Sequence, residues 1–197
     1  MRTLGLDIST VATGWVVLDD GKLKAKGIIN PVNDLKADGV FKTKKEASEY
    51  LKSELRKFRY ISGRIATVIA EFDPDVVTVE RAYLGSTTRK KKLPNGQWTT
   101  EKGTWNPNAL QIMTLLAGGA LYFWMFAKAL PGSGKRTYFV GASTARAAVG
   151  CKGNAKKADV IKFVNETFDM DITDDNEADA FVLAYYGYQA AKGESHA

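Results

Sequence analysis

Cysteine and histidine are almost missing from this sequence, whose 197 residues include one of each, Cys151 and His196. A single cysteine excludes an internal disulfide framework and is typical of a reducing compartment, so we expect a cytoplasmic protein. His196 lies in the tail 193–197, which we expect to be disordered. The lone histidine argues against Ser–His and Cys–His catalysis and against a histidine-rich zinc site. A metal site in this chain would therefore depend on oxygen ligands.

Acidic residues are scarce over most of the chain. Lysine and arginine together number 28 against 22 aspartates and glutamates, and six of these acids lie within residues 169–179. The rest of the protein therefore holds 28 basic residues and only 16 acidic ones. A basic body with one acidic spot favours a polyanionic ligand together with a cation site. Charge alone is equally typical of an ordinary soluble protein of high pI.

Long stretches without charge are also rare, and the one at 109–127 has the 19 residues that a bilayer-spanning helix needs. It contains Gln111 and Thr114, and strand-like segments lie on both sides of it. We therefore interpret 108–129 as a buried helix and expect no membrane partner. Its apolar side chains fall on more than one face, and a single sheet covers only one. A twofold-related copy would cover another face, so we expect a homodimer.

The first part of the chain shows three strands, a long helix and a fourth strand. Closely spaced apolar runs at 3–9, 13–19 and 22–30 predict an antiparallel meander. Apolar residues then recur every three or four positions over 43–72, which predicts one long helix with a single apolar face. The β-branched run at 75–80 predicts the next strand.

The second part of the chain adds one strand and several helices. Residues 89–103 are basic and rich in turn formers, which indicates a mobile loop or hairpin. A strand is predicted at 137–140, and helices are predicted at 143–149, 155–168 and about 174–191. No repeat or linker divides the sequence. The pattern predicts a single α/β domain over 1–192, with a mixed sheet flanked by helices.

Two carboxylates, Asp7 and Glu80, end predicted buried strands. Either one alone is also explained by a strand end that emerges into solvent. Asp179 differs, because it lies inside the last predicted helix, between Ala178 and Ala180. Since open sheets place their ligand sites at strand ends, and a helix face can meet these ends, we expect the three carboxylates to converge.

Other polar residues surround the start of the last helix. Asp174, with Glu177 three residues later, fits a capping box, and acids are favoured at helix N-termini in any case. Asp175 and Asn176 precede Asp179 by four and three residues, so they share or adjoin its helix face. We expect Asp175 or Asn176 to support the three carboxylates.

The chemistry of this residue set favours a metal-dependent nuclease. Gathering ionised carboxylates within about 4 Å costs roughly 1–4 kcal/mol per pair, and a divalent cation removes that repulsion. Ligation by oxygen alone favours Mg²⁺, with Mn²⁺ as a substitute. Two such ions, roughly 3.5–4 Å apart, can activate water and stabilise the leaving oxygen in phosphodiester hydrolysis.

Four segments, taken in order, resemble the RuvC Holliday-junction resolvases of the RNase H-like superfamily. The segments are LGLDISTVATGWVVLD at 4–19, VVTVERAYLG at 76–85, ARAAVGCKGNAKKADVIKFV at 145–164 and NEADAFVLAYYG at 176–187. Each is a weak signal alone, but four in family order are fairly specific. The resemblance implies an RNase H-like fold with a mixed five-stranded sheet, and a dimeric crossover junction endodeoxyribonuclease acting on four-way DNA junctions.

The resemblance also implies roles for individual residues. It places Asp7, Glu80 and Asp179 on catalytic, metal-binding positions, and Tyr83 on an aromatic that works at the junction core. Lys157 aligns with a family lysine, so it is expected close to the scissile phosphate. The expected phosphate-binding surface consists of the following basic residues: Arg89, Lys90, Lys91, Lys92, Arg146, Lys156 and Lys157.

The sequence departs from the family at three places. Asn176 stands where RuvC proteins carry a further aspartate, Arg146 is one position away from the expected lysine, and 89–103 resembles an insertion. For the missing aspartate, we expect either Asp175 or Glu177 to substitute or Asn176 itself to act as a neutral ligand. These differences suggest a divergent branch of phage type, and we expect the protein to act in the cytoplasm of a bacterial or phage-infected cell. They leave two alternatives open. One is an ATPase of the actin or sugar-kinase type, whose first phosphate loop also resembles 4–15, and the other is a non-catalytic junction-binding protein.

Overall fold

The computed structural model describes residues 1–81, 88–93, 97–102 and 135–193. Its main sheet has five strands in the order β3-β2-β1-β4-β7. The predicted helix 108–129 and Tyr83 lie outside the described residues. No helix in the part of the chain that the structure describes combines the length and apolarity of a bilayer-spanning segment.

The sheet is mixed, as the sequence predicts. The strands β1 (Arg2–Asp7), β2 (Thr13–Asp19) and β3 (Lys22–Ile29) form the predicted antiparallel meander. The strands β4 (Val76–Glu80) and β7 (Arg136–Val140) extend it on the other side of β1, both parallel to their neighbours. The carboxyl ends of β1, β4 and β7 therefore lie at the same edge of the sheet, which is where an open sheet of this kind places its ligand site.

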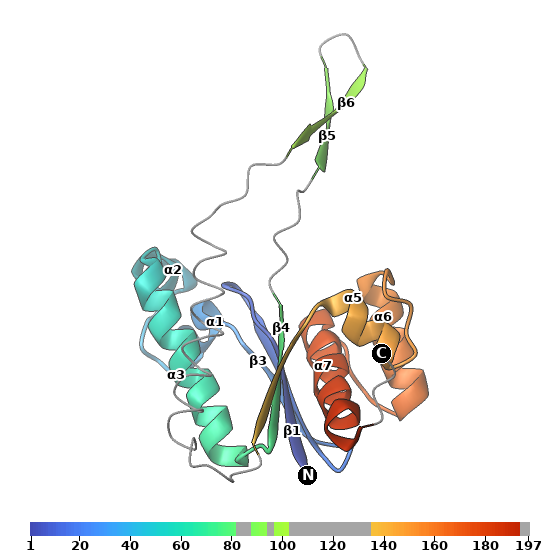
Figure 1. The fold of residues 1–197 in the computed structure, drawn as a ribbon. Helices are drawn as coiled ribbons and strands as arrows, with labels where there is room; N and C mark the ends of the chain where they lie inside the picture. Colours follow the sequence, from blue (N-terminus) through green and yellow to red (C-terminus); the bar gives the residue numbers. More distant parts are fainter. Residues whose placement is uncertain (82–87, 94–96, 103–134, 194–197) are drawn as a thin grey trace.

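Helices cover both faces of the sheet (Figure 1). On one face, α3 (Glu54–Phe72) packs its buried isoleucines and Val68 against the apolar side chains of β1 and β4. On the other face lies α7 (Asp175–Lys192), which packs with α5 (Ala142–Ala148) and α6 (Lys157–Phe168) in a second core cluster. The elements thus form three layers, with the sheet in the middle.

The predicted helix over 43–72 is in fact two helices, α2 (Lys44–Tyr50) and α3. Leu51 ends α2 and is buried in a small cluster with Leu35 and Ala47. Ser53 follows in an extended conformation and begins α3. The apolar spacing continues through the break, because Leu51 packs inward like a helical residue, and this hides the break in the sequence pattern.

A short helix, α1 (Pro31–Ala37), was not predicted from the sequence. Its start nevertheless carries a recognisable signal. The side chain of Asn30 accepts a hydrogen bond from the Asn33 backbone, the Asp34 carboxylate accepts one from the Asn30 backbone, and Pro31 occupies the first turn. Asn-Pro followed by an acid is a start signal typical of helices.

The basic segment that follows β4 contains a hairpin. The strands β5 (Thr88–Lys92) and β6 (Trp98–Lys102) pair antiparallel as a sheet of their own. Of the two alternatives predicted for 89–103, a loop or a hairpin, the paired residues of β5 and β6 confirm the hairpin. The side chains of Arg89, Lys90, Lys91 and Lys92 are not among those described, so their expected role in DNA binding stays a prediction.

Glycines allow α7 to lie directly on the sheet. A Cβ atom built on Gly5 of β1 would lie 2.0 Å from the Ala180 carbonyl oxygen, and one built on Gly14 of β2 would lie 2.1 Å from the Asn176 carbonyl oxygen. In the reverse direction, a Cβ atom on Gly187 of α7 would lie 2.2 Å from the Thr78 hydroxyl of β4. The helix that carries Asp179 is therefore held against three strands by contacts that leave no room for a side chain.

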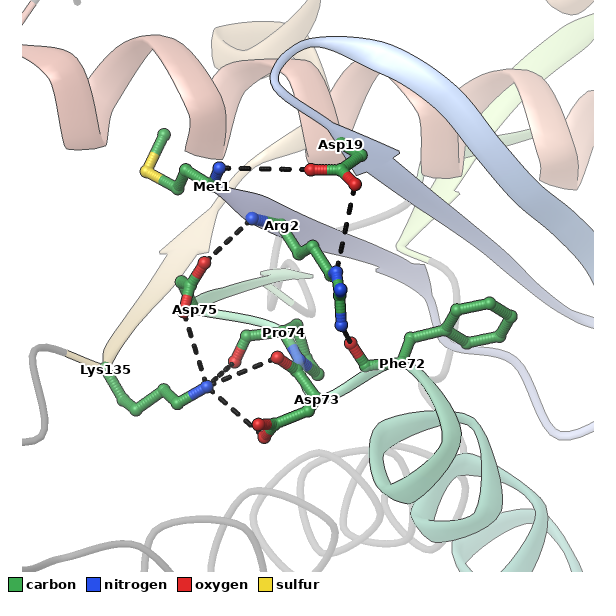
Figure 2. A network of polar contacts seen from close by, with 8 residues as sticks. All are labelled: Met1, Arg2, Asp19, Phe72, Asp73, Pro74, Asp75 and Lys135. Atoms are coloured by element: carbon green, nitrogen blue, oxygen red, sulfur yellow. Dashed lines mark hydrogen bonds and ion pairs between the residues drawn. The ribbon is translucent and has the colours of Figure 1, made fainter.

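The amino-terminal edge of β1 and β4 is closed by a polar network (Figure 2). Lys135, which precedes β7, donates to the carbonyl oxygens of Asp73 and Pro74 and to the carboxylates of Asp73 and Asp75. The backbone of Arg2 donates to Asp75, and its guanidinium donates to the Phe72 carbonyl. These contacts tie β7 and the end of α3 to β1 at the edge opposite Asp7 and Glu80.

Candidate active site

Asp7 and Glu80 meet at the carboxyl edge of the sheet. Each is the last residue of its strand, and the strands β1 and β4 are parallel neighbours with Leu6 beside Val79. The residues that follow this pair are Asp7 and Glu80, so the register alone places them side by side. Glu80 is near enough to Asp7 to raise the pKa of its carboxyl group.

The environment of Asp7 disfavours its ionised form. Burial, a hydrogen bond to Glu80 and the negative charges of Glu80 and Asp179 together raise the pKa of Asp7 to about 8. The ammonium group of Lys157 acts in the opposite direction but does not compensate. Among the described residues, no ion pair joins Asp7 or Glu80 to a lysine or arginine. Ionising both carboxyl groups is therefore unfavourable in the part of the chain that the structure describes, and a bound cation would favour the ionised forms.

The helix α7 brings Asn176 and Asp179 to the same edge. Asp7 pairs with Gly14 across β1 and β2, and Asn176 packs directly over Gly14. Asp179 lies one turn further along α7, and its negative charge raises the pKa of Asp7. The Asn176 amide nitrogen donates to Asp174, the residue that caps the helix. Asn176 and Asp179 thus lie at the edge of the sheet where Asp7 and Glu80 end their strands, and Asp179 is near enough to raise the pKa of Asp7.

Arg146 of α5 holds the Asp179 carboxylate in a two-pronged ion pair. Its Nε and Nη2 atoms donate to Oδ1 at 3.0 and 2.7 Å, and Nη2 also donates to Oδ2 at 2.9 Å. Both side chains are only 14% exposed. The sequence predicted Arg146 as a phosphate contact, and that role stays a prediction; in this structure its partly buried guanidinium pairs with Asp179.

Lys157 begins α6 and pairs with Asp175. The Lys157 ammonium donates a hydrogen bond to the Asp175 carboxylate, and this bond raises the pKa of Lys157; the negative charges of Asp175, Asp179 and Asp7 raise it further. Its side chain is 71% exposed, so it lies at the rim of the site. Lys156 precedes the helix and is also exposed.

The capping box expected at Asp174 and Glu177 forms only in part. Asp174 accepts a hydrogen bond from the Asn176 backbone and caps α7, as predicted. Glu177 instead points to the sheet and pairs with Lys26 of β3 at 2.5 Å, with only 10% of its side chain exposed. Glu177 is therefore engaged elsewhere and does not replace the aspartate that RuvC proteins carry at the Asn176 position.

The Lys26–Glu177 pair should contribute to stability. We expect Lys26→Met to lower the free energy of unfolding by about 2–3 kcal/mol, because it leaves a buried carboxylate without a partner. Urea denaturation followed by circular dichroism measures this. Lys24→Met, an exposed change on the same strand, is the matched control and should have little effect. Equal stability of the two variants would contradict the assignment.

The donor set fits a hard divalent cation, although it does not form a closed cage. In the described part of the chain, no group of three or more acidic, histidine or cysteine side chains is arranged to hold a metal ion. The carboxylates of Asp7 and Glu80 are adjacent and repel each other, and oxygen ligands of this kind suit Mg²⁺. Asp179 is close by, but Arg146 occupies its oxygens.

Some residues that shape the site were missed at the level of sequence. Gly5 and Gly14 let α7 approach the sheet closely. A glycine inside an otherwise apolar strand often marks such a close approach, so the sequence did contain a signal for them. Lys26 has no sequence signal, since its partner lies 151 residues away. Tyr83 lies outside the described residues, so its predicted contact with the junction core stays a prediction.

Comparison with known proteins identifies the fold. No family model and no curated protein matches the sequence. Among solved structures, Thermus thermophilus RuvC in complex with Holliday junction substrate aligns with a TM-score of 0.61 and 18% identity, covering 99% of this chain and 98% of that one. The chain has the RuvC fold.

Two further structures agree with this. A second Thermus thermophilus RuvC structure aligns with a TM-score of 0.60 and the same identity and coverage. Ydc2, the yeast mitochondrial Holliday junction resolvase, aligns with a TM-score of 0.53 and 13% identity, over 95% of this chain and 78% of that one. The predicted resemblance to RuvC and the predicted RNase H-like α/β fold are both confirmed.

Proposed function

We propose that this protein is a metal-dependent endonuclease that cleaves Holliday junctions or related branched DNA by hydrolysing phosphodiester bonds. The observation that carries the proposal is the adjacency of Asp7 and Glu80 at the ends of parallel strands, with Asp179 beside them. This arrangement occurs in a fold shared with a RuvC protein solved on a Holliday junction substrate.

The metal ligands in this proposal are Asp7, Glu80 and Asp179, with Asp175 or Asn176 in support. Mg²⁺ is the expected ion, with Mn²⁺ as a substitute and two ions per site. Such ions, when bound, activate water and stabilise the leaving oxygen. The protein contributes the positions of the ligands, which the register of β1 and β4 and the close packing of α7 determine.

Lys157 and Lys156 are proposed to contact the DNA backbone. Both are exposed and lie where the turn at 150–156 leads into α6. Gly150 adopts a positive φ of 91° in this turn, a conformation that glycine accepts readily. The Lys157 ammonium lies in the field of Asp7 and Asp179, so a phosphate near the carboxylates would also be near Lys157. The 89–92 run and Tyr83 extend this proposed surface.

Junction cleavage is proposed to require two copies of the protein, each cutting one of two opposite strands. The predicted interface is the apolar segment 108–129, which is outside the described residues. The protein is proposed to act in the cytoplasm of a bacterial or phage-infected cell, where branched DNA forms during recombination and repair.

A synthetic four-way junction tests the proposal directly. We expect the purified protein to cut the labelled junction in Mg²⁺ or Mn²⁺, to cut a linear duplex of the same sequence far less, and to lose activity in EDTA. Restoring Mg²⁺ should restore cutting. Junction binding in EDTA without cutting in any metal would contradict the nuclease and favour a non-catalytic junction-binding protein. ATP-dependent activity without junction binding would favour an ATPase.

A further inference from the structure

The ion pair between Arg146 and Asp179 occupies a carboxylate that the proposed metal site requires. A carboxylate has two oxygens and about four acceptor directions. Oδ1 of Asp179 accepts two bonds from Arg146 and Oδ2 accepts one. About one acceptor direction, on Oδ2, is left, so a metal ion that needs more than this one direction competes with the guanidinium for Asp179.

Arg146 also contacts the turn before α6. Its guanidinium Nη1 atom donates to the Ala155 carbonyl at 3.3 Å, and its backbone carbonyl accepts a hydrogen bond from the Cys151 backbone at 2.9 Å. Its neighbour Ala145 is fully buried in α5. Arg146 thus connects α5, the turn before α6 and α7, and it is poorly placed to reach bulk solvent.

The local charge explains why a cation is needed at this position. The negative charges of Glu80 and Asp179 both raise the pKa of Asp7, so the three carboxylates lie near one another at the sheet edge. Lys157, the other cation near them, is mostly exposed and is paired with Asp175. Arg146 is the only cation in the described residues that forms an ion pair with one of these three carboxylates.

We propose that Arg146 is an internal counter-ion that occupies Asp179 in the metal-free protein and must release it, in whole or in part, when metal binds. This inference rests on the proposed metal-dependent function. Arg146 is then a positioning residue with two effects. It stabilises the metal-free fold, and it weakens metal binding by competing for Asp179.

Direct measurement of Mn²⁺ affinity tests this, by isothermal titration calorimetry or by the electron paramagnetic resonance signal of free Mn²⁺. Arg146→Gln removes the charge-assisted hydrogen bonds to Asp179 and frees this carboxylate, so the variant should bind Mn²⁺ about tenfold more tightly than wild type. Arg146→Lys keeps the charge but loses the fork, and it should bind about threefold more tightly than wild type. If long-range charge alone were responsible, Arg146→Lys would match wild type, and this result would overturn the proposal.

Thermal unfolding provides a second readout that does not depend on activity. Without metal, Arg146→Gln should unfold at a lower temperature than wild type, and saturating Mn²⁺ should raise its unfolding temperature by more than it raises that of wild type. Lys162→Gln removes an exposed charge of α6 whose ion-pair partner among the described residues is Glu166. This variant is the control and should leave Mn²⁺ affinity unchanged.

A measurement on the wild-type protein covers the case in which the variants fail to fold. The NMR signal of the Arg146 Nε–H should shift when Mg²⁺ is added. An unshifted signal at Mg²⁺ saturation would overturn the proposal, as would unchanged or weaker Mn²⁺ binding by Arg146→Gln. If wild type binds no Mn²⁺, the metal site itself fails, and the proposed function fails with it. If Asp7→Asn abolishes binding but Arg146→Gln does not tighten it, only the role of Arg146 fails.

Discussion

Asp7→Asn is expected to lower the rate of junction cleavage by about a thousandfold or more while leaving the fold and junction binding intact. The amide keeps the shape of the side chain but removes the negative charge that Asp7 adds beside Glu80. Metal-assisted stabilisation of the transition state amounts to several kcal/mol, which corresponds to this loss of rate. Single-turnover cleavage of a labelled junction, with binding followed by gel shift in Ca²⁺ or EDTA, separates the two effects.

The same variant should change stability in a defined direction. The folded protein raises the pKa of Asp7 from 3.8 to about 8, so the folded state holds this proton more tightly than the unfolded chain does. In EDTA, the stability of wild type should therefore fall as pH rises from about 4 to about 8. Asp7→Asn removes this titration, so its stability should vary less with pH over that window and exceed that of wild type at pH 8.

Asp171→Asn is the matched control for Asp7→Asn. It makes the same chemical change on an exposed residue of the turn before α7 and should retain wild-type cleavage. Full activity of Asp7→Asn would remove Asp7 from the catalytic centre. Loss of junction binding together with cleavage would instead give Asp7 a role in holding DNA.

Gly5→Ala is expected to destabilise the protein by about 3 kcal/mol or more. Its Cβ would lie 2.0 Å from the Ala180 carbonyl oxygen and 2.4 Å from the Ala184 nitrogen. Both are backbone atoms of α7, so no side-chain rotation relieves the clash and the helix itself must move. Because α7 carries Asp179, any folded population should also lose cleavage. Urea denaturation and junction cleavage measure the two effects.

Gly63→Ala, in contrast to Gly5→Ala, is expected to stabilise the protein. Gly63 is exposed inside α3, and a Cβ there meets nothing within 4 Å. Alanine favours helix over glycine by roughly 0.5–1 kcal/mol, so this variant should be slightly more stable than wild type. If Gly5→Ala were as stable as Gly63→Ala, the close packing of α7 on β1 would be wrong.

The sequence alone determined most of the element types and which strand ends carry carboxylates. Alternation of apolar residues and short turns is local information, so the meander, the later strand at 137–140 and the last three helices were predicted within about two residues. Asp7 and Glu80 were found because a charge that ends an apolar strand stands out in the sequence. Their adjacency then follows from the parallel register of β1 and β4.

Only the tertiary structure decided which side chains pair. Nothing in the sequence indicated that Arg146, expected on the DNA surface, also pairs with Asp179, 33 residues away. Glu177 was assigned to a cap, yet it pairs with Lys26 of β3. The break between α2 and α3 depends on Leu51 packing against α1, a helix that was not predicted. A local pattern specifies which face of an element is buried, whereas the partner of a charged group depends on elements that meet only after the chain has folded.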